Sequence, residues 1–450
     1  MSLPSYPEYK KSSRQVLHAV PSSWNLVQLR RLAPVIESGT SVNALDNEPS
    51  QGQPSVLKTS CVYTGKFRPE ECKEIVEEEI EKASCPVKGG SLIVSRMNTP
   101  ELVGAAGLVE SDIETLFLPD RLWQVRLGKA TSHFVYYWTQ SSLYRDQVKS
   151  ACSGTSSSMQ NLSQENFLSF YAALPSKEEQ QTIASFLDRE TTKIDTLIAE
   201  QQRLIELLHE KRQVVISRAV SKGLNSNAPM KDSGVEWLGE MPEHWEVRKI
   251  SQLFVGIGSG TTPKSDEIEY YEDGDIPWVV TGDLNDELLE SCSNFITKKA
   301  MQAHTTLRLY PKGSVAVAMY GATIGKASLL GLEATVNQAC CVLPPSAKVN
   351  ENFLLHFLIS AKNHLISLAT GGGQPNINQD IIRSLRIPLP EVKEQIEIVK
   401  HLSKILVEIE SLLGLSNRQV LLLQERRSAL ISAAVTGQID VRGLAAEVAA

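Results

Sequence analysis

The chain has 450 residues, 42% of them apolar and 22% charged, a composition that excludes collagen-like and wholly disordered proteins. At about 100–200 residues per domain, this length predicts several domains, each able to bury a core. The net charge is −7, from 45 Lys and Arg against 52 Asp and Glu, so a nucleic-acid-binding surface would have to be a local basic patch.

The cysteines and the hydropathy pattern point to an intracellular protein. The seven cysteines are odd in number and contain no C-x-x-C pair, which is typical of reduced, mostly buried thiols. No stretch approaches the roughly 18 apolar residues of a membrane span, and no apolar run follows the basic residues of the N-terminal segment. We therefore expect a cytoplasmic protein without a membrane partner.

The first half of the chain begins with a Pro21-x-x-Trp24 segment and continues into a mixed region. The runs SLIVSRM (91–97) and RLWQVRL (121–127) predict short strands, and residues 70–83 predict a surface helix. Residues 174–220 are rich in Leu, Glu, Gln, Lys and Arg and contain no proline after Pro175, so they predict one long helix.

The second half repeats this order. It begins with Pro242-x-x-Trp245, and β-rich runs separated by Gly, Pro, Asp and Asn predict strands over 276–280, 314–320, 327–330 and 339–344. A helix is predicted near 352–360, and a second long helix over 389–435.

The two halves are copies of one frame. Their long helical segments align without a gap at an offset of 390 − 175 = 215 residues, which pairs the Glu-Gln dipeptides at 179–180 and 394–395. Their entry segments align at an offset of 242 − 21 = 221 residues and pair Trp24 with Trp245. The regions between these landmarks have diverged, so an internal repeat with two different middles is indicated.

Apolar residues recur at the same 3–4 spacing in both long helices, which is typical of a coiled-coil seam. The predicted seam consists of Ile183, Leu187, Ile194, Leu197, Leu208, Val215, Ile398, Leu402, Ile409, Leu412, Leu423 and Leu430. We expect the two seams to pack together. The alternative is that each helix packs only on its own domain, but about 45 residues at ~1.5 Å each span about 67 Å, too far for one domain to cover.

These patterns predict an α/β (α+β) fold, in which two mixed domains of short strands and helices are joined by two long coiled-coil helices in a pseudo-two-fold repeat. We place the first domain at residues 1–173, the first long helix at 174–224, the second domain at 225–388, and the second long helix with a C-terminal tail at 389–450.

No enzyme motif is complete. The glycines of residues 254–260 resemble a nucleotide-binding loop, but residues 261–264, Thr-Thr-Pro-Lys, look like a turn and not like the start of a helix. A P-loop ending at Lys326 would need Gly at 320 and Ser or Thr at 327, where the chain has Tyr320 and Ala327. No His and Cys spacing suits zinc. We expect no catalytic residue, metal or cofactor on this chain.

Polar loops that contain Gly carry Lys, Arg, Asn, Gln and Tyr, the residue types that contact bases and phosphates. These loops lie at residues 95–99, 154–160, 259–264, 320–326 and 371–376. The hypothesised DNA contacts are Arg96, Asn98, Lys264, Tyr320, Lys326, Gln374 and Asn376.

Several motifs follow one another in an order that covers nearly the whole chain, and the first and the last of them occur in both copies. They are P-x-x-W, G-x-T-P, I-P-W-V-x-x-G-D-L (276–284), G-x-x-Q-P-N-I-N, and L-P-x-x-x-E-Q before each long helix. In this order the chain resembles the specificity (S) subunit of type I DNA restriction–modification systems, and the segment 230–245 is especially typical of that family. The first copy departs from the pattern, because it lacks the G-x-T-P and G-G-G-Q-P segments.

The resemblance implies two target-recognition domains, each reading half of a split, asymmetric DNA sequence through the major groove, joined by antiparallel helices that act as a spacer. It implies a non-catalytic subunit in a bacterial or archaeal cytoplasm. Its partners would be double-stranded DNA, two methyltransferase (M) subunits that carry S-adenosylmethionine, and restriction (R) subunits that use ATP and Mg.

Two other classes of protein stay open at this point. One is the specificity subunit of a related type II (IIB- or IIG-like) system, in which a partner chain both methylates and cleaves. The other is a coiled-coil protein scaffold with no role on DNA.

Overall fold

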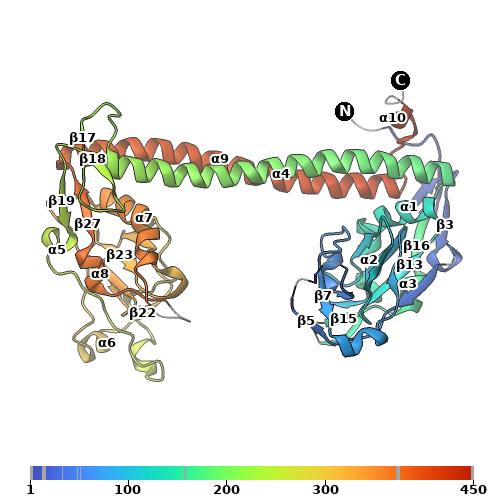
Figure 1. Cartoon of the computed structure of the whole chain (residues 1–450), viewed down its shortest axis with the longest axis horizontal. Coiled ribbons are helices and arrows are strands. Elements are labelled where there is room, and N and C mark those ends of the chain that lie inside the picture. Colours follow the sequence, from blue (N-terminus) through green and yellow to red (C-terminus); the bar gives the residue numbers. More distant parts are fainter. Residues whose placement is uncertain are drawn as a thin grey trace. The chain divides into compact units, whose positions relative to one another are not determined.

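The computed structural model describes residues 4–12, 17–32, 34–47, 49–50, 52–156, 159–370 and 375–446. The chain forms two compact units, one made of residues 1–202 with 418–450 and the other of residues 203–417. Two long helices, α4 (Lys177–Lys222) and α9 (Val392–Val435), each run from one unit into the other. The predicted fold class is confirmed (Figure 1). Among the described residues, no helix is long and apolar enough to cross a membrane.

The first unit contains mainly antiparallel strands. Its sheets have the orders β11-β9-β13-β4 (Ala106–Leu108, Ser91–Ser95, Leu122–Arg126, Val35–Ser38), β5-β7-β6-β12-β8 (Ala44–Leu45, Cys72–Ile75, Ser55–Leu57, Ile113–Phe117, Pro86–Val87), β10-β15-β14 (Met97–Asn98, Met159–Asn161, Ser153–Ser156), β1-β2 (Tyr9–Lys11, Ala19–Pro21) and β16-β3 (Tyr171–Leu174, Asn25–Gln28). Its shorter helices are α1 (Lys129–Thr139), α2 (Ser142–Ala151), α3 (Gln164–Ser169) and α10 (Arg442–Ala446). The predicted strands over 91–97 and 121–127 are confirmed as β9 and β13, which pair with each other.

The surface helix predicted over residues 70–83 is wrong. Strand β7 and a short 3-10 helix, Glu77–Lys82, lie there instead. Cys72 and Ile75 are buried, and β7 pairs with β5 on one side and β6 on the other. Sheet pairing therefore prevails over helix propensity, which is a small term that tertiary contacts often override.

The second unit has its own sheets and confirms the predicted strands over 276–280, 314–320, 327–330 and 339–344 as β20, β23, β24 and β26. The sheet orders are β21-β24-β23-β26 (Leu288–Leu289, Ala327–Leu330, Val315–Ala318, Cys340–Leu343), β22-β20-β25 (Phe295–Ile296, Ile276–Val279, Thr335–Val336), β17-β18 (Met230–Asp232, Glu240–Pro242) and β19-β27 (Glu246–Lys249, Arg386–Leu389). Its shorter helices are α5 (Ile250–Leu253), α6 (Lys298–Ala303), α7 (Glu351–Ser367) and α8 (Gln379–Ser384). Helix α7 includes the predicted helix near 352–360.

The repeated sequence frame corresponds to a repeated set of contacts. The hairpin β1-β2 and the pair β3-β16 of the first copy have counterparts in the hairpin β17-β18 and the pair β19-β27 of the second. Trp24 and Trp245 are both completely buried. Trp24 Nε1 donates a hydrogen bond to Glu179 Oε1 at 3.2 Å, and Trp245 Nε1 donates to Glu394 Oε1 at 3.1 Å. A buried indole N–H needs such an acceptor, which explains why the P-x-x-W and E-Q motifs occur together in both copies.

Each buried tryptophan also contacts the end of the other long helix. Gly437 follows α9 with a φ of 73°, and a Cβ there would lie 3.3 Å from Trp24 Cζ3; Gly223 follows α4 with a φ of 70°, and its Cβ would lie 3.2 Å from Trp245 Cζ2. Glycine fits both positions because it adopts positive φ without a steric penalty. In each unit the start of one long helix therefore lies beside the end of the other, which makes the pair antiparallel.

The long helices pack along an apolar seam. Ile183, Leu187 and Ile194 are buried in the first unit, where the first two share a core with Ile431 and Val435. In the second unit, the structure buries Leu208, Ile398, Leu402, Ile409 and Leu413. The predicted Val215, Leu423 and Leu430 are half-buried.

The predicted seam is wrong at Leu197 and Leu412, whose exposed fractions are 45% and 48%. The 3–4 spacing continues from Ile194 to half-buried Ile198, and from Ile409 to buried Leu413. At each place two adjacent residues are apolar, and the seam follows the second of them, four residues after the previous seam residue. This step of four keeps the buried side of each helix facing the other helix.

Candidate nucleic-acid interface

Three of the predicted contact residues lie around one loop of the second unit. Tyr320 and Asn376 form an isolated β-bridge, and Gly321 N donates to Pro375 O at 2.9 Å. The Tyr320 side chain is 44% exposed, whereas Asn376 is half-buried. The fold thus brings together two predicted residues that are far apart in the sequence.

Lys326 lies at the other end of the same loop, immediately before β24. Its backbone N–H donates to Thr323 O at 2.9 Å, and its carbonyl accepts from Ala318 N at 2.8 Å. Because β23 ends at Ala318 and β24 begins at Ala327, these bonds fix the loop to the sheet. Gln374 lies outside the described residues.

The loop over 259–264 is attached close to this one. Thr262 Oγ1 donates to Gln338 Oε1 at 2.5 Å, and Met319 N, just before Tyr320, donates to Ala339 O at 2.8 Å. Both loops are therefore tied to residues 338–339, which immediately precede β26. Lys264 is exposed and lies 3.5 Å from Glu267, so a phosphate would have to compete with that carboxylate for it.

The predicted residues of the first unit are held by internal hydrogen bonds. Arg96 Nε donates to Asp120 O at 2.7 Å, and the Arg96 side chain is half-buried. Asn98 is only 8% exposed. Its Nδ2 donates to Tyr63 Oη at 2.9 Å and its Oδ1 accepts from Thr99 N at 2.9 Å. Reading a base would break these bonds, so Asn98 is better explained as a residue that stabilises the turn. The predicted loop over 154–160 lies partly outside the described residues.

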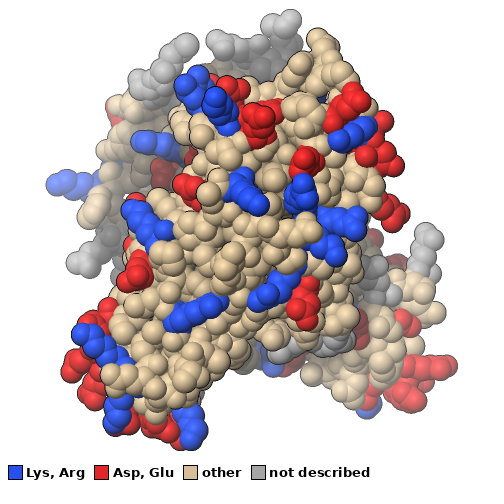
Figure 2. Space-filling model, turned by 90° about the vertical axis from the view of Figure 1, so that its left-hand side faces the viewer, with Lys and Arg blue, Asp and Glu red and all other residues tan. Residues whose placement is uncertain are grey.

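The surface of the second unit carries both signs of charge. Figure 2 shows Lys and Arg dispersed among uncharged residues over the centre of one face, while Asp and Glu gather mainly toward its edges. This face has no continuous basic patch, in keeping with the net charge of −7. Any DNA contact would therefore depend on particular basic residues.

Four of the seven cysteines are buried, and the other three are half-buried. All seven cysteines are free, and burial raises the pKa of Cys61 and Cys341 to about 12. Because the thiolate is the nucleophilic form, these side chains do not offer a nucleophile near neutral pH. Within the described ranges, no three His, Cys, Asp or Glu side chains are grouped so that they could hold a metal ion.

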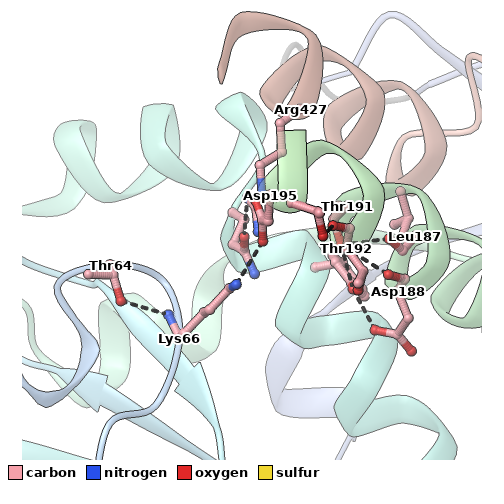
Figure 3. Close-up of polar contacts among 11 residues, drawn as sticks. Thr64, Lys66, Leu187, Asp188, Thr191, Thr192, Asp195 and Arg427 are labelled. Carbon is pink, nitrogen blue, oxygen red and sulfur yellow. Dashed lines mark hydrogen bonds and ion pairs between the residues drawn. The ribbon is translucent and has the colours of Figure 1, made fainter. Parts of the chain in front are cut away.

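Sequence reasoning missed a set of charged residues where each mixed domain meets the long helices. In the first unit, Lys66 and Arg427 both bind Asp195 (Figure 3). In the second unit, Arg212 lies near Glu287 and Glu410. The offset of 215 residues was the available signal, because it pairs Asp195 with Glu410 and Arg212 with Arg427.

Comparisons with known proteins agree with this architecture. The family model described as "Type I restriction modification DNA specificity domain" matches residues 21–207 and 242–417. The type I restriction enzyme MjaVIII specificity subunit of Methanocaldococcus jannaschii is 23% identical over 97% of this chain and 98% of its own length. The EcoR124I/EcoR124II specificity subunit of Escherichia coli is 29% identical over 39% of this chain and 41% of its own length.

Two solved structures share the fold. A chain from a study of complex assembly and conformational transition of the type I R-M system has a TM-score of 0.70 and 16% identity, over 93% of this chain and 99% of that one. The HsdS subunit from Thermoanaerobacter tengcongensis has a TM-score of 0.52 and 17% identity, over 93% of this chain and 98% of that one.

Proposed function

The chain belongs to the type I restriction–modification DNA specificity family, and we propose that each of its two mixed domains reads one half of a bipartite, asymmetric DNA target. The observation that carries this proposal is the repeat. The same frame, made of a hairpin, a buried tryptophan and a long helix, occurs with each of two domains whose sheets and loops differ. A duplicated scaffold with two unlike readers fits a target whose two halves differ in sequence.

The loops around Tyr320 in the second unit are the best-supported contact region. Tyr320 is exposed on a loop held at both ends by the sheet, and Asn376 and Lys326 lie at its base. An amide suits the edge of adenine, and a lysine suits guanine or phosphate. A rigid element also places such side chains with less loss of entropy than a mobile one.

Exposed leucines lie at matching positions of the two copies of the long helix. Leu197 and Leu422 are exposed in the first unit, and Leu412 and Leu207 are exposed in the second. The offset of 215 relates both pairs, because 412 − 197 = 215 and 422 − 207 = 215. We infer that two methyltransferase subunits dock here, since exposed apolar side chains repeated at equivalent positions favour equivalent interfaces.

The chain would act without chemistry of its own. S-adenosylmethionine would be carried by the methyltransferase subunits, and ATP and Mg by restriction subunits that join the complex. The helices α4 and α9, which connect the two units, would set the spacing between the half-sites.

Replacing Lys326 with alanine tests the proposed contact region. The chain would be assembled with its methyltransferase subunits, and its affinity for a random-sequence duplex pool would be measured across a salt series. We expect weaker binding and a salt slope smaller by about one phosphate contact. Lys348→Ala is the matched control. Lys348 is exposed, but its carbonyl accepts a hydrogen bond from Gln395 of α9, so this lysine lies beside the long helix and not in the proposed contact region.

An unchanged salt slope for Lys326→Ala would remove Lys326 from the interface. If the wild-type chain added no DNA binding to that of the methyltransferase subunits, the proposed function itself would be wrong.

A further inference from the structure

An ion pair between an acid and an arginine joins the long helices at two places. In the first unit, Arg427 Nε of α9 donates to Asp195 Oδ1 of α4 at 2.9 Å. In the second unit, Arg212 Nη1 of α4 lies 3.5 Å from Glu410 Oε2 of α9. The repeat relates the two pairs, because 410 − 195 and 427 − 212 both equal 215. Each copy of the frame therefore contributes one acid and one arginine, and we call each pair a helix dyad.

The first mixed domain binds the acid of its dyad. Lys66 Nζ lies 2.7 Å from Asp195 Oδ2, and Arg427 Nη1 also donates to Gln140 Oε1 at the end of α1, 3.0 Å away. Figure 3 shows Lys66 and Arg427 approaching the same carboxylate from opposite sides. The side chains of Asp195 and Arg427 are only 27% and 19% exposed, so solvent screens this cluster less than an ordinary surface pair.

This contact lies on α4 some distance beyond the apolar core of the unit. The apolar core that joins the first domain to α4 ends at Leu187, and Asp195 lies eight residues further along, or about 12 Å. A cavity of 530 Å³, lined by Lys66, Asp195 and Tyr137 among others, separates the domain from the helix in this region. Tyr137 Oη of the domain donates to Asp188 Oδ1 at 2.5 Å next to the core, and Lys66 contacts α4 seven residues further along. A change at Lys66 therefore removes a domain–helix contact that lies outside the core.

The second mixed domain binds the arginine of its dyad. Arg212 Nη2 lies 3.4 Å from Glu287 Oε1, just before β21. The apolar core of this unit ends on α9 at Leu402, with Leu406 partly buried beside it. Glu410 follows Leu402 by the same eight residues as Asp195 follows Leu187. The spacing between core and dyad is therefore repeated, but the second domain contributes an anion where the first domain contributes a cation.

We propose that the helix dyad is a docking point that positions each recognition domain on the helix pair, and that the two domains bind its opposite charges. Because a dyad presents both signs, a domain can dock through a single cation or a single anion, provided that this residue lies beside the dyad member of opposite charge. Domains of unlike sequence can then dock at the same angle on the same frame. The proposal rests on the proposed function, because the angle matters through the spacing of the two half-sites.

The test measures spacing and not affinity alone. The chain, assembled with its methyltransferase subunits, would be given duplexes whose two half-sites are separated by the natural spacer or by one base pair more or fewer. We expect Lys66→Glu to reduce the preference for the natural spacer roughly fivefold, while methylation of the natural target persists. Glu287→Lys should do the same through the second domain.

Matched controls separate docking from general charge effects. Lys82 lies 2.7 Å from Glu79 of its own domain and is 61% exposed, against 56% for Lys66, so Lys82→Glu breaks an equal pair that does not reach the helices. Glu269, which pairs with Lys299 of its own domain, provides the control Glu269→Lys. Both control variants should keep the wild-type spacer preference.

Charge exchange separates the helix pair from the domain contact. The double variant Asp195→Arg with Arg427→Asp restores the pair between the helices but leaves Lys66 facing an arginine, so its preference should stay relaxed. Adding Lys66→Glu to that double variant should restore the preference. If Lys66→Glu lowers the yield of folded chain, the neutral Lys66→Met is expected to give a smaller loss of preference.

The docking proposal would be overturned if Lys66→Glu and Lys66→Met both proved as selective for spacer length as Lys82→Glu. A different result bears on the proposed function: if the wild-type complex showed no methylation that depends on this chain at any spacer length, DNA reading itself would be excluded.

Discussion

At the scale of single residues, a buried indole and a helix-terminal carboxylate define the frame of each copy. Glu394 lies in the first turn of α9, accepts from Trp245 Nε1 and also lies 2.9 Å from His244 Nε2. A carboxylate at this position also interacts favourably with the positive end of the helix dipole. One side chain therefore ties the entry segment to the start of the helix.

Replacing Glu394 with alanine should lower the free energy of unfolding by about 1–3 kcal/mol, because it leaves the buried Trp245 N–H without an acceptor. Glu394→Gln keeps an acceptor oxygen and should cost less. Urea denaturation followed by tryptophan fluorescence checks this. Glu397→Ala, at an exposed position of the same helix, is the control. Equal midpoints for Glu394→Ala and Glu397→Ala would show that the indole bond contributes nothing.

His356 gives the second unit a dependence on pH. Burial, helped by the nearby Arg212, lowers the pKa of His356 from 6.5 to about 4. The folded chain therefore keeps this imidazole neutral, while the unfolded chain protonates it below pH 6.5. The free energy of unfolding is thus highest above pH 6.5 with respect to this group and falls as the pH decreases toward 4.

His356→Gln should remove that part of the acid sensitivity. Between pH 7 and pH 4.5 the wild-type chain should lose on the order of 2 kcal/mol more stability than the variant. Denaturation curves at both pH values measure this difference, and His401→Gln, at an exposed position of α9, is the control. The explanation fails if wild type and His356→Gln lose the same amount.

At the scale of elements, the helix pair combines a buried seam with exposed apolar positions. Ile409 is 2% exposed and packs with Leu208 and Leu413, whereas Leu412 is 48% exposed. The two residues are three positions apart on one helix. Ile409 therefore contributes to packing between the helices, whereas Leu412 belongs to the surface that we propose binds a partner.

Ile409→Ala should cost about 2–5 kcal/mol of unfolding free energy, because it leaves a cavity in the seam. Leu412→Ala should change stability by no more than about 0.5 kcal/mol. Thermal unfolding of the two variants checks this ordering. The reverse ordering would mean that the seam follows Leu412 after all. Binding of the methyltransferase subunits should respond the other way, weakening with Leu412→Ala.

The sequence predicted those elements whose signal is local. The long helices and strands such as β9 and β23 follow from composition, periodicity and turn residues. At the adjacent pairs Leu197-Ile198 and Leu412-Leu413, a step of either three or four residues from the previous seam residue reaches an apolar side chain. Only the packing of the helices decides which of the two residues joins the seam. Strand β7 was missed because its pairing with β5 and β6 is a contact between distant segments.

The candidate site was predictable only in part, for the same reason. Loop composition made the segments of Tyr320 and Asn376 candidate contacts, but their bridge is a product of the fold. The hydrogen bond from Asn98 to Tyr63 and the ion pair of Lys66 with Asp195 join residues that no local pattern connects. These contacts decide whether a side chain is available for DNA or is already engaged.

At the scale of the whole molecule, one frame is used twice and carries two different mixed domains. The frame supplies the buried tryptophans, the helix seam, the helix dyads and the exposed leucines at matching positions. The mixed domains differ in strand order, in loop composition and in the charge that they present to the frame. Identity of the frame and difference of the readers together predict a target with two unlike halves.

The most direct measurement is a map of methylated bases in a host genome that carries the methyltransferase subunit with and without this chain. We predict methylation that depends on the chain, at two unlike half-sites separated by a constant number of unspecified bases. A chimera with residues 225–388 replaced by another recognition domain should change one half-site only. A single contiguous motif, or a chimera that alters both halves, would contradict the account.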